Sequence, residues 1–410
     1  DRVAARGLGD VYKRQLVSGP HLIVATKKSK VGHITTDNHA IWRVDESVVV
    51  PFSKSELHLT VWELKLLQRQ KSMISDLLRT PAFYFSYTYD LTNSQQRLSS
   101  AYYAAHNRSK NNSIYQNHHR TPSNSLTTLH SKFAWNYNIL RPFLAKVEHL
   151  SYCIAVIHGA VFVQHCSVNG KHFRWSLISR RSTSRAGTRF FRRGCDTQGN
   201  VANFVETEQL VEHGEQGLTS FVQTRGSIPL FWTQLPDPVV YLPTPEIDVG
   251  CDHTAAFVAH FKEQIQYYGT QVIVNLINHT KAEGALERSY HSLQKTSEVP
   301  GVHYVAFDFH RECSNLQWGK LHHLVSRLKE RLEQFGHFFK AADQSSNHQG
   351  NVSLPLPVTN ISLQSGVFRT NCMDCLDRTN VVQSLLAKEN LNMVLHKFGV
   401  LKTELDTTYA

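Results

Sequence analysis

Two short apolar segments in the second half of the chain constrain the fold more than any other feature. Gln271 to Asn278 and His303 to Phe309 are each typical of a fully buried strand. The spacing of apolar residues predicts a helix over His253 to Tyr268, before the first segment, and another over Ala285 to Lys295, between the two. Buried strands that alternate with helices are typical of an α/β architecture, and we therefore predict that fold class.

The first half of the chain is predicted to be richer in strands than in helices. Its predicted elements are strands over 21–26, 83–89, 151–168 and 173–178, and a helix over 57–78. The basic residues from Lys27 to Lys30 are expected to form a turn, and Asn169-Gly170 is a strong hairpin signal. Further predicted elements in the second half are strands over 200–207, 218–225 and 366–371, and helices over 316–339 and from Thr379 onward.

The 410 residues suggest two or three domains at roughly 150 residues each. We predict a first domain over 16–183, with a polar insertion over 101–130, and a second over 184–410. Residues 1–15 resemble translated cloning sequence and are expected to be a non-native leader. Because the chain stops soon after a helical segment, we expect it to be truncated before any membrane anchor.

Charge and cysteine content narrow the classes of partner and compartment. The formal net charge of +11 favours an anionic partner, which leaves nucleic acid, an anionic membrane or a phosphorylated substrate. The seven cysteines are too few and too scattered for a secreted disulfide framework, so a reducing compartment is expected. No apolar run reaches the roughly 18 residues that a membrane span needs.

One motif carries the chemistry. Cys372 and Arg378 form a Cys-x5-Arg pattern between the strand over 366–371 and the helix that follows. A loop of this length can direct backbone N–H groups at one phosphate, and the helix adds its positive N-terminal dipole. We predict that the dipole and Arg378 lower the pKa of the Cys372 thiol, that Arg378 grips two phosphate oxygens, and that Thr379 hydrogen-bonds the thiolate or helps release product. The predicted phosphate-binding residues of the loop are Met373, Cys375, Leu376, Asp377, Thr379 and Asn380.

Two other interpretations of these cysteines are open. A Cys-x5-Arg match can arise by chance, in which case Cys372 is a buried inert thiol. Cys372 and Cys375 also form half of a zinc site, but the other cysteines supply no second Cys-x2-Cys pair, so we predict no metal.

The acidic residues of the loop have more than one possible role. Asp374 is our candidate for the general acid that protonates the leaving oxygen, and Asp377 is expected to brace the loop. The alternative is that both carboxylates only brace the loop through backbone N–H groups. Asp308 is a rival acid, although a capping role is expected for it, and Arg225 could contact phosphate or pair with a carboxylate.

The whole run from Arg369 to Asn380, RTNCMDCLDRTN, resembles the catalytic signature of the Sac-domain phosphoinositide phosphatases. Further stretches resemble the same family: 83–93, 185–208, 223–234 and 304–313. The resemblance covers residues 20–402, and the loop with Val381 to Leu386 is most similar to the branch anchored in endoplasmic reticulum and Golgi membranes. That branch carries C-terminal transmembrane helices, which this chain lacks.

The resemblance implies a cofactor-independent enzyme that removes phosphate from phosphatidylinositol 4-phosphate, and also from the 3-phosphate, through a phosphocysteine intermediate. It implies an N-terminal β-rich Sac-specific domain over 16–183, packed on a cysteine-phosphatase-like domain over 184–410. Cys372 falls on the nucleophile of the family and Arg378 on its phosphate-binding arginine. The implied location is the cytosolic face of endoplasmic reticulum or Golgi membranes, with this chain alone expected to be soluble.

Two functions compete with this one: a catalytically weak phosphoinositide-binding or scaffold module, and a protein phosphatase with the same loop. No motif supports nucleic-acid binding. The expected partner is a phosphoinositide headgroup in an anionic membrane. Residues 171–193 hold eight basic residues and no acidic one, and we predict that Arg192 and Arg193 belong to a cationic face toward lipid.

Overall fold

The computed structural model describes residues 18–19, 21–35, 37–51, 59–99, 129–144, 153–187, 192–234, 243–314, 318–342 and 361–402. The predicted leader over 1–15 and nearly all of the predicted insertion over 101–130 lie outside these residues. The chain divides into two compact units, one of residues 1–164 with 176–183 and the other of residues 165–175 with 184–410. The domain limits given above stay a prediction.

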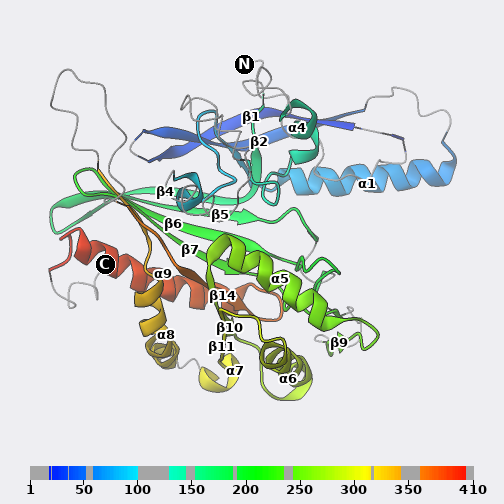
Figure 1. The fold of residues 1–410 in the computed structure, drawn as a ribbon. Coiled ribbons are helices and arrows are strands. Elements are labelled where there is room, and N and C mark those ends of the chain that lie inside the picture. The colour runs from blue at the N-terminus through cyan, green and yellow to red at the C-terminus, as the bar shows by residue number, and fades with distance from the viewer. Residues whose placement is uncertain are drawn as a thin grey trace, which may run out of the picture. The chain divides into compact units, whose positions relative to one another are not determined.

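The first unit is built on antiparallel strands (Figure 1). Strands β1 (His21–Ile34) and β2 (His39–Pro51) form a hairpin, and β3 (Phe83–Phe85) pairs with β2 on one side and with β4 (Val156–Val168) on the other. The described residues of this unit include the helices α1 (Val61–Arg79), α2 (Gln95–Leu98) and α4 (Tyr137–Leu144). A capping box between Thr60 and Glu63 begins α1, which ends before Thr80 and Pro81 as predicted.

One turn prediction and one strand prediction in this unit were wrong. The Lys27 to Lys30 segment is not a turn, because it continues β1 and pairs with β2. Strand β3 stops at Phe85, well before Tyr89, because side chains of the next residues bond to backbone groups. Ser86 donates to the Ala40 carbonyl at 2.7 Å, and the Asp90 carboxylate accepts from the Thr92 backbone N–H at 2.9 Å.

The hairpin predicted at Asn169-Gly170 is present. Both residues have left-handed backbone conformations, with φ of 51° and 73°, as the favoured two-residue hairpin turns require. They join β4 to β5 (Lys171–Arg181).

The second unit holds a mixed sheet in the order β6-β7-β14-β10-β11. Its strands are β6 (Val205–His213), β7 (Gly217–Arg225), β10 (Thr270–Asn275), β11 (Val302–Ala306) and β14 (Gly366–Asn371). Strand β14, the last of these along the chain, lies between β7 and β10 and runs parallel to both. The short strands β12 (Phe338–Ala341) and β13 (Ile361–Ser362) extend the sheet beside β7, and β8 (Trp232–Thr233) pairs with β9 (Glu246–Ile247).

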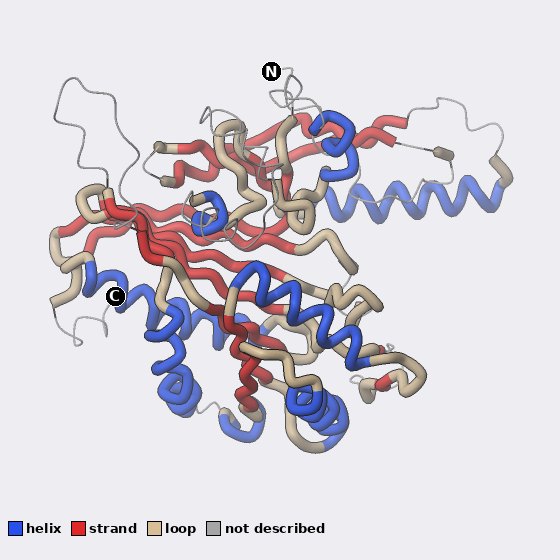
Figure 2. Tube along the Cα trace, in the orientation of Figure 1, coloured by secondary structure: helices blue, strands red, loops and turns tan. Residues whose placement is uncertain are grey.

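Helices lie on both faces of this sheet (Figure 2). They are α5 (His253–Tyr268), α6 (Lys281–Thr296), α8 (Leu321–Phe335) and α9 (Asp377–Lys397), with the short α7 (Phe309–Glu312) and the 3-10 turn Trp318–Lys320. Alternate residues of β10 pack on opposite faces of the sheet. Val272 and Val274 pack with leucines of α8 and α9, and Ile273 packs with aromatic residues of α5 and α6. This packing confirms the predicted α/β class.

One predicted helix was too long. The segment 316–339 contains α8 only as far as Phe335, and Gly336 then takes a left-handed conformation with φ of 60°. Such a residue ends a helix, so that Phe338 begins β12 instead. No helix among the described residues is long and apolar enough to cross a membrane.

Candidate active site

The Cys-x5-Arg loop follows the carboxyl end of β14 and leads into α9. All six residues of β14 are buried, and Cys372, the first residue after the strand, is 1% exposed. Helix α9 begins at Asp377, two residues earlier than predicted, and its N-cap residue Leu376 makes no side-chain cap hydrogen bond. The loop therefore has its nucleophile candidate at one end and a helix N-terminus at the other, an arrangement suited to an anion.

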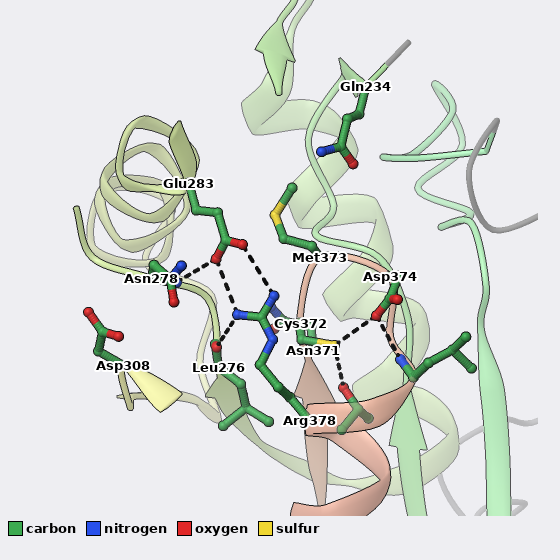
Figure 3. Close-up of polar contacts among 12 residues, drawn as sticks. Gln234, Leu276, Asn278, Glu283, Asp308, Asn371, Cys372, Met373, Asp374 and Arg378 are labelled. Carbon is green, nitrogen blue, oxygen red and sulfur yellow. Dashed lines mark hydrogen bonds and ion pairs between the residues drawn. The ribbon is translucent and has the colours of Figure 1, made fainter. Parts of the chain in front are cut away.

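Among the described residues, the Cys372 sulfur has two hydrogen-bond partners (Figure 3). The Thr379 hydroxyl donates to Sγ at 3.2 Å, and the thiol donates to Oδ1 of Asp374 at 3.3 Å. The same Asp374 oxygen accepts the Leu376 backbone N–H at 3.1 Å. Thr379 and Asp374 thus lie against the sulfur, as expected for residues that act with it, and Asp374 also braces the loop.

The direction of the pKa shift of Cys372 differs from the prediction. Burial raises the pKa of its thiol, and the carboxylate of Asp374 raises it further. Arg378 and the Thr379 hydroxyl lower this pKa, but they do not overcome burial. The direction is therefore opposite to the predicted lowering of this pKa, because burial of the loop disfavours the charged sulfur.

Arg378 lies against a carboxylate that the sequence analysis did not identify. Its Nη1 and Nη2 atoms each lie 3.2 Å from an oxygen of Glu283, and Nη1 also donates to the Leu276 carbonyl at 3.1 Å (Figure 3). Burial alone would lower the pKa of Arg378, but the hydrogen bonds and charge of Glu283 raise it. One feature of the sequence could have identified Glu283: it lies in the first turn of α6, the helix that follows β10.

Arg225 lies at the end of β7, where that strand pairs with β14. Its guanidinium donates to the side-chain oxygen of Asn380. Burial lowers the pKa of Arg225, while the nearby Cys375 and Cys372 act in the opposite direction. The structure thus brings Arg225 and Asn380 together beside the loop, and the carboxylate partner considered for Arg225 is an amide instead.

The remaining loop residues differ in exposure. Met373 is buried with the apolar side chains of α5 and α6, and Asp377 is exposed at the start of α9. Cys375 has a left-handed backbone with φ of 58°, and burial raises the pKa of its thiol to about 12. Its Sγ donates to the Cys372 carbonyl at 3.6 Å, so that Cys375 braces the loop rather than reacting.

The rival acid Asp308 caps a helix, as expected. Its carboxylate accepts the backbone N–H groups of His279 and Arg311, both at 3.0 Å. Burial opposes ionisation, but these donors keep the pKa of Asp308 below its ordinary value. A carboxylate of this kind is a poor proton donor.

The basic segment 171–193 is not a continuous cationic surface. Arg180 and Arg193 are buried, with exposed fractions of 0% and 5%, and Arg174 is ion-paired with Glu212 at 2.6 Å. Arg192 is exposed. The prediction that Arg193 faces lipid was wrong, because its guanidinium bonds inside the second unit.

A buried strand, a Cys-x5-Arg loop and a helix N-terminus together form a site that is suited to bind an oxyanion. No three His, Cys, Asp or Glu side chains gather as a metal site would require within the described part of the chain. The SacI homology domain model matches residues 9–314, and the chain belongs to this family.

Several phosphatases resemble the chain over most of its length. Phosphatidylinositol-3-phosphatase SAC1-A of Danio rerio is 41% identical over 387 residues, which is 94% of this chain and 60% of the relative. The Drosophila melanogaster SAC1 enzyme is 42% identical over 395 residues, 96% of this chain and 60% of the relative. The Saccharomyces cerevisiae SAC1 enzyme is 35% identical over 399 residues, 93% of this chain and 57% of the relative. The chain thus spans about 60% of the length of these curated relatives.

Proposed function

We propose that this chain is a phosphoinositide phosphatase that hydrolyses phosphatidylinositol 4-phosphate, and also the 3-phosphate, to phosphatidylinositol. The contact between the Thr379 hydroxyl and the Cys372 sulfur, 3.2 Å long, carries the proposal. It joins the nucleophile candidate to the first turn of α9, so that an attacking sulfur and uncapped N–H groups share one loop. The names of the relatives, phosphatidylinositol-3-phosphatases, support the substrate class.

The first chemical step transfers phosphate to sulfur. The Cys372 thiolate attacks phosphorus, the bond from phosphorus to the inositol oxygen breaks, and that oxygen takes a proton from Asp374. Arg378 and the loop N–H groups stabilise the charge on the equatorial oxygens. The proton of the resting thiol passes to the Asp374 carboxylate that it contacts, so that Cys372 becomes the attacking thiolate and Asp374 becomes the protonated acid.

The second step returns the enzyme to its starting state. A water attacks the phosphocysteine, Asp374 accepts the proton of the water, and the bond between phosphorus and sulfur breaks to release phosphate and the thiolate. Thr379, which already donates to the sulfur, stabilises the leaving thiolate. No step requires a metal ion or another cofactor.

Two negative charges near the loop favour substrates with a single phosphate. Asp374 lies against the sulfur, and Glu283 lies against Arg378. A second phosphate close to either carboxylate would be repelled. Arg225, which donates to Asn380 beside the loop, is proposed to contact the phosphate or its inositol ring. The backbones of Met373, Cys375, Leu376 and Asp377 complete the phosphate-binding loop.

A panel of phosphoinositides in liposomes tests the proposal. Wild-type protein and Cys372→Ser are compared for phosphate release, each with and without EDTA. We expect release from the monophosphates that EDTA does not change and that Cys372→Ser abolishes. No release from any lipid, or release that Cys372→Ser does not affect, would reject the proposal, and loss with EDTA would indicate metal chemistry.

A second candidate function is a catalytically weak phosphoinositide-binding module. The burial of Cys372 favours it, because a buried thiol with a raised pKa is a poor nucleophile. Liposome binding without phosphate release would support this module. A protein phosphatase is less well supported, since the relatives named above carry lipid phosphatase names.

Membrane location is part of the same proposal. The headgroup lies in an anionic membrane, and we propose the cytosolic face of endoplasmic reticulum or Golgi membranes for the full-length protein. The proposed organisation is a Sac-specific domain over 16–183 and a catalytic domain over 184–410. Imaging of the full-length protein with membrane markers tests the location.

A further inference from the structure

Arg193 is a buried cation whose guanidinium reaches the phosphate loop. It is 5% exposed, and its Nη1 donates to the Met373 carbonyl at 2.9 Å. Its Nη2 donates to the side-chain oxygen of Gln234, also at 2.9 Å, and the guanidinium carbon lies 5.7 Å from the centre of the Trp232 ring. Arg193 thus connects Met373, a loop residue 180 positions away along the chain, to the side chain of Gln234 outside the loop.

The backbone that carries Arg193 is held from several sides. Arg185 donates to the Arg193 carbonyl at 2.8 Å, and the next amide, of Gly194, donates to the Ser227 hydroxyl at 2.9 Å. Gly194 has a left-handed φ of 61°, and a Cβ there would lie 2.4 Å from the Leu230 carbonyl oxygen. These contacts fix the backbone from which the guanidinium reaches the loop.

Met373 is held at both of its ends. Its side chain packs with Leu230, Trp232 and Phe257, and its carbonyl accepts from Arg193. A peptide carbonyl that points into an anion site repels the anion. When the carbonyl points outward, the N–H of the same peptide group points inward, toward the anion. Holding the carbonyl next to Cys372 in an outward position therefore favours oxyanion binding. In Figure 3, Gln234 lies beside Met373, away from Arg378.

We propose that Arg193 is a positioning residue that, through the Met373 carbonyl, holds the phosphate loop in its oxyanion-binding conformation. Gln234 acts through Arg193 by fixing the other arm of the guanidinium. This role rests on the proposed function, because it assigns a new residue to the same loop. It requires no contact between Arg193 and the substrate.

The experiment measures oxyanion binding separately from turnover. Alkylation of Cys372 by iodoacetamide is measured at increasing concentrations of tungstate, a stable phosphate-like anion that protects the sulfur when it binds. Mass spectrometry locates the modified residue. Phosphate release, kcat and KM are measured in parallel on a short-chain phosphoinositide. We expect Arg193→Met to weaken tungstate protection of Cys372 at least tenfold and to lower kcat at least tenfold, with KM changing less than threefold.

Two further variants separate positioning from loss of folding. Arg180→Met is the matched control, because Arg180 is also buried and donates to two backbone carbonyls, at Leu91 and Asn93, in the first unit. It should lower the melting temperature as Arg193→Met does and leave tungstate protection within twofold of wild type. Gln234→Leu leaves the loop untouched and should weaken protection threefold or more. The double variant of Arg193→Met with Gln234→Leu should be no worse than Arg193→Met.

The results of these measurements decide whether Arg193 positions the loop. Unchanged tungstate protection in Arg193→Met, equal loss in Arg180→Met, or additive losses in the double variant would overturn the role of Arg193. The absence of tungstate protection in wild type would overturn it as well. If wild type is protected but releases no phosphate from any phosphoinositide, the proposed function fails and the positioning role is still decided by the protection data.

Discussion

Glu283 accepts from both terminal nitrogens of Arg378, each contact being 3.2 Å long, and the two side chains are 80% or more buried. Glu283 also accepts the Asn278 backbone N–H at 2.6 Å, so its carboxylate is fixed to the segment that follows β10. Among the described residues, no acceptor faces the Nε atom of Arg378. The ion pair therefore holds the guanidinium by one edge and leaves another edge for phosphate.

The first prediction concerns this ion pair. Glu283→Gln should lower kcat by roughly 10- to 100-fold, because a misplaced guanidinium stabilises the transition state poorly. KM should change less than kcat. Steady-state kinetics on a short-chain phosphoinositide measures both, and Glu333→Gln, at an exposed position of α8, is the control. A higher kcat in Glu283→Gln would mean that Glu283 competes with phosphate instead.

The second prediction concerns the protonation of Cys372. Burial and Asp374 raise the pKa of its thiol. The rate of alkylation by iodoacetamide should therefore increase at a higher pH than it does for a free cysteine. Removing the charge in Asp374→Asn should shift this profile to lower pH, whereas Thr379→Val should shift it to higher pH, since the Thr379 hydroxyl lowers the pKa. Opposite shifts, measured by mass spectrometry between pH 6 and 10, would contradict the contacts described here.

The third prediction tests Asp374 as the general acid. Asp374→Asn should lower kcat by roughly 100-fold or more and remove the basic limb of the pH–rate profile, because a neutral amide cannot donate the proton. Asp377→Asn, which changes an exposed carboxylate of the same loop, should leave both within about twofold of wild type. An unchanged rate and basic limb in Asp374→Asn would leave it only a bracing role.

The fourth prediction concerns Arg225. Arg225→Met should raise KM and weaken tungstate inhibition by roughly tenfold, because a half-buried cation beside the loop adds charge-assisted hydrogen bonds to the substrate. Arg225→Lys should recover part of the loss. Arg69→Met, at an exposed position of α1, provides the comparison for loss of a positive charge elsewhere. An equal effect in the two methionine variants would indicate that only net charge matters.

Much of the second unit could be predicted because its elements depend on local patterns. The bounds predicted for the helix His253–Tyr268 and the strand Gly366–Asn371 are those of α5 and β14. Errors arose where a side-chain hydrogen bond or a single residue ended an element. Gly336 ends α8, and the side-chain contacts of Ser86 and Asp90 end β3. The spacing of apolar residues carries no information about where these two elements end.

The sequence by itself determined the α/β class and the order of strand, cysteine loop and helix, because apolar spacing and loop length are local properties of the chain. Only the tertiary structure decided which side chains meet the loop. Insertion of β14 between β7 and β10 brings Arg225 and Glu283 to it, and the Arg378 partner Glu283 is 95 residues away along the chain. Burial of Cys372, which reverses the predicted direction of its pKa, likewise results from packing on both faces of the sheet.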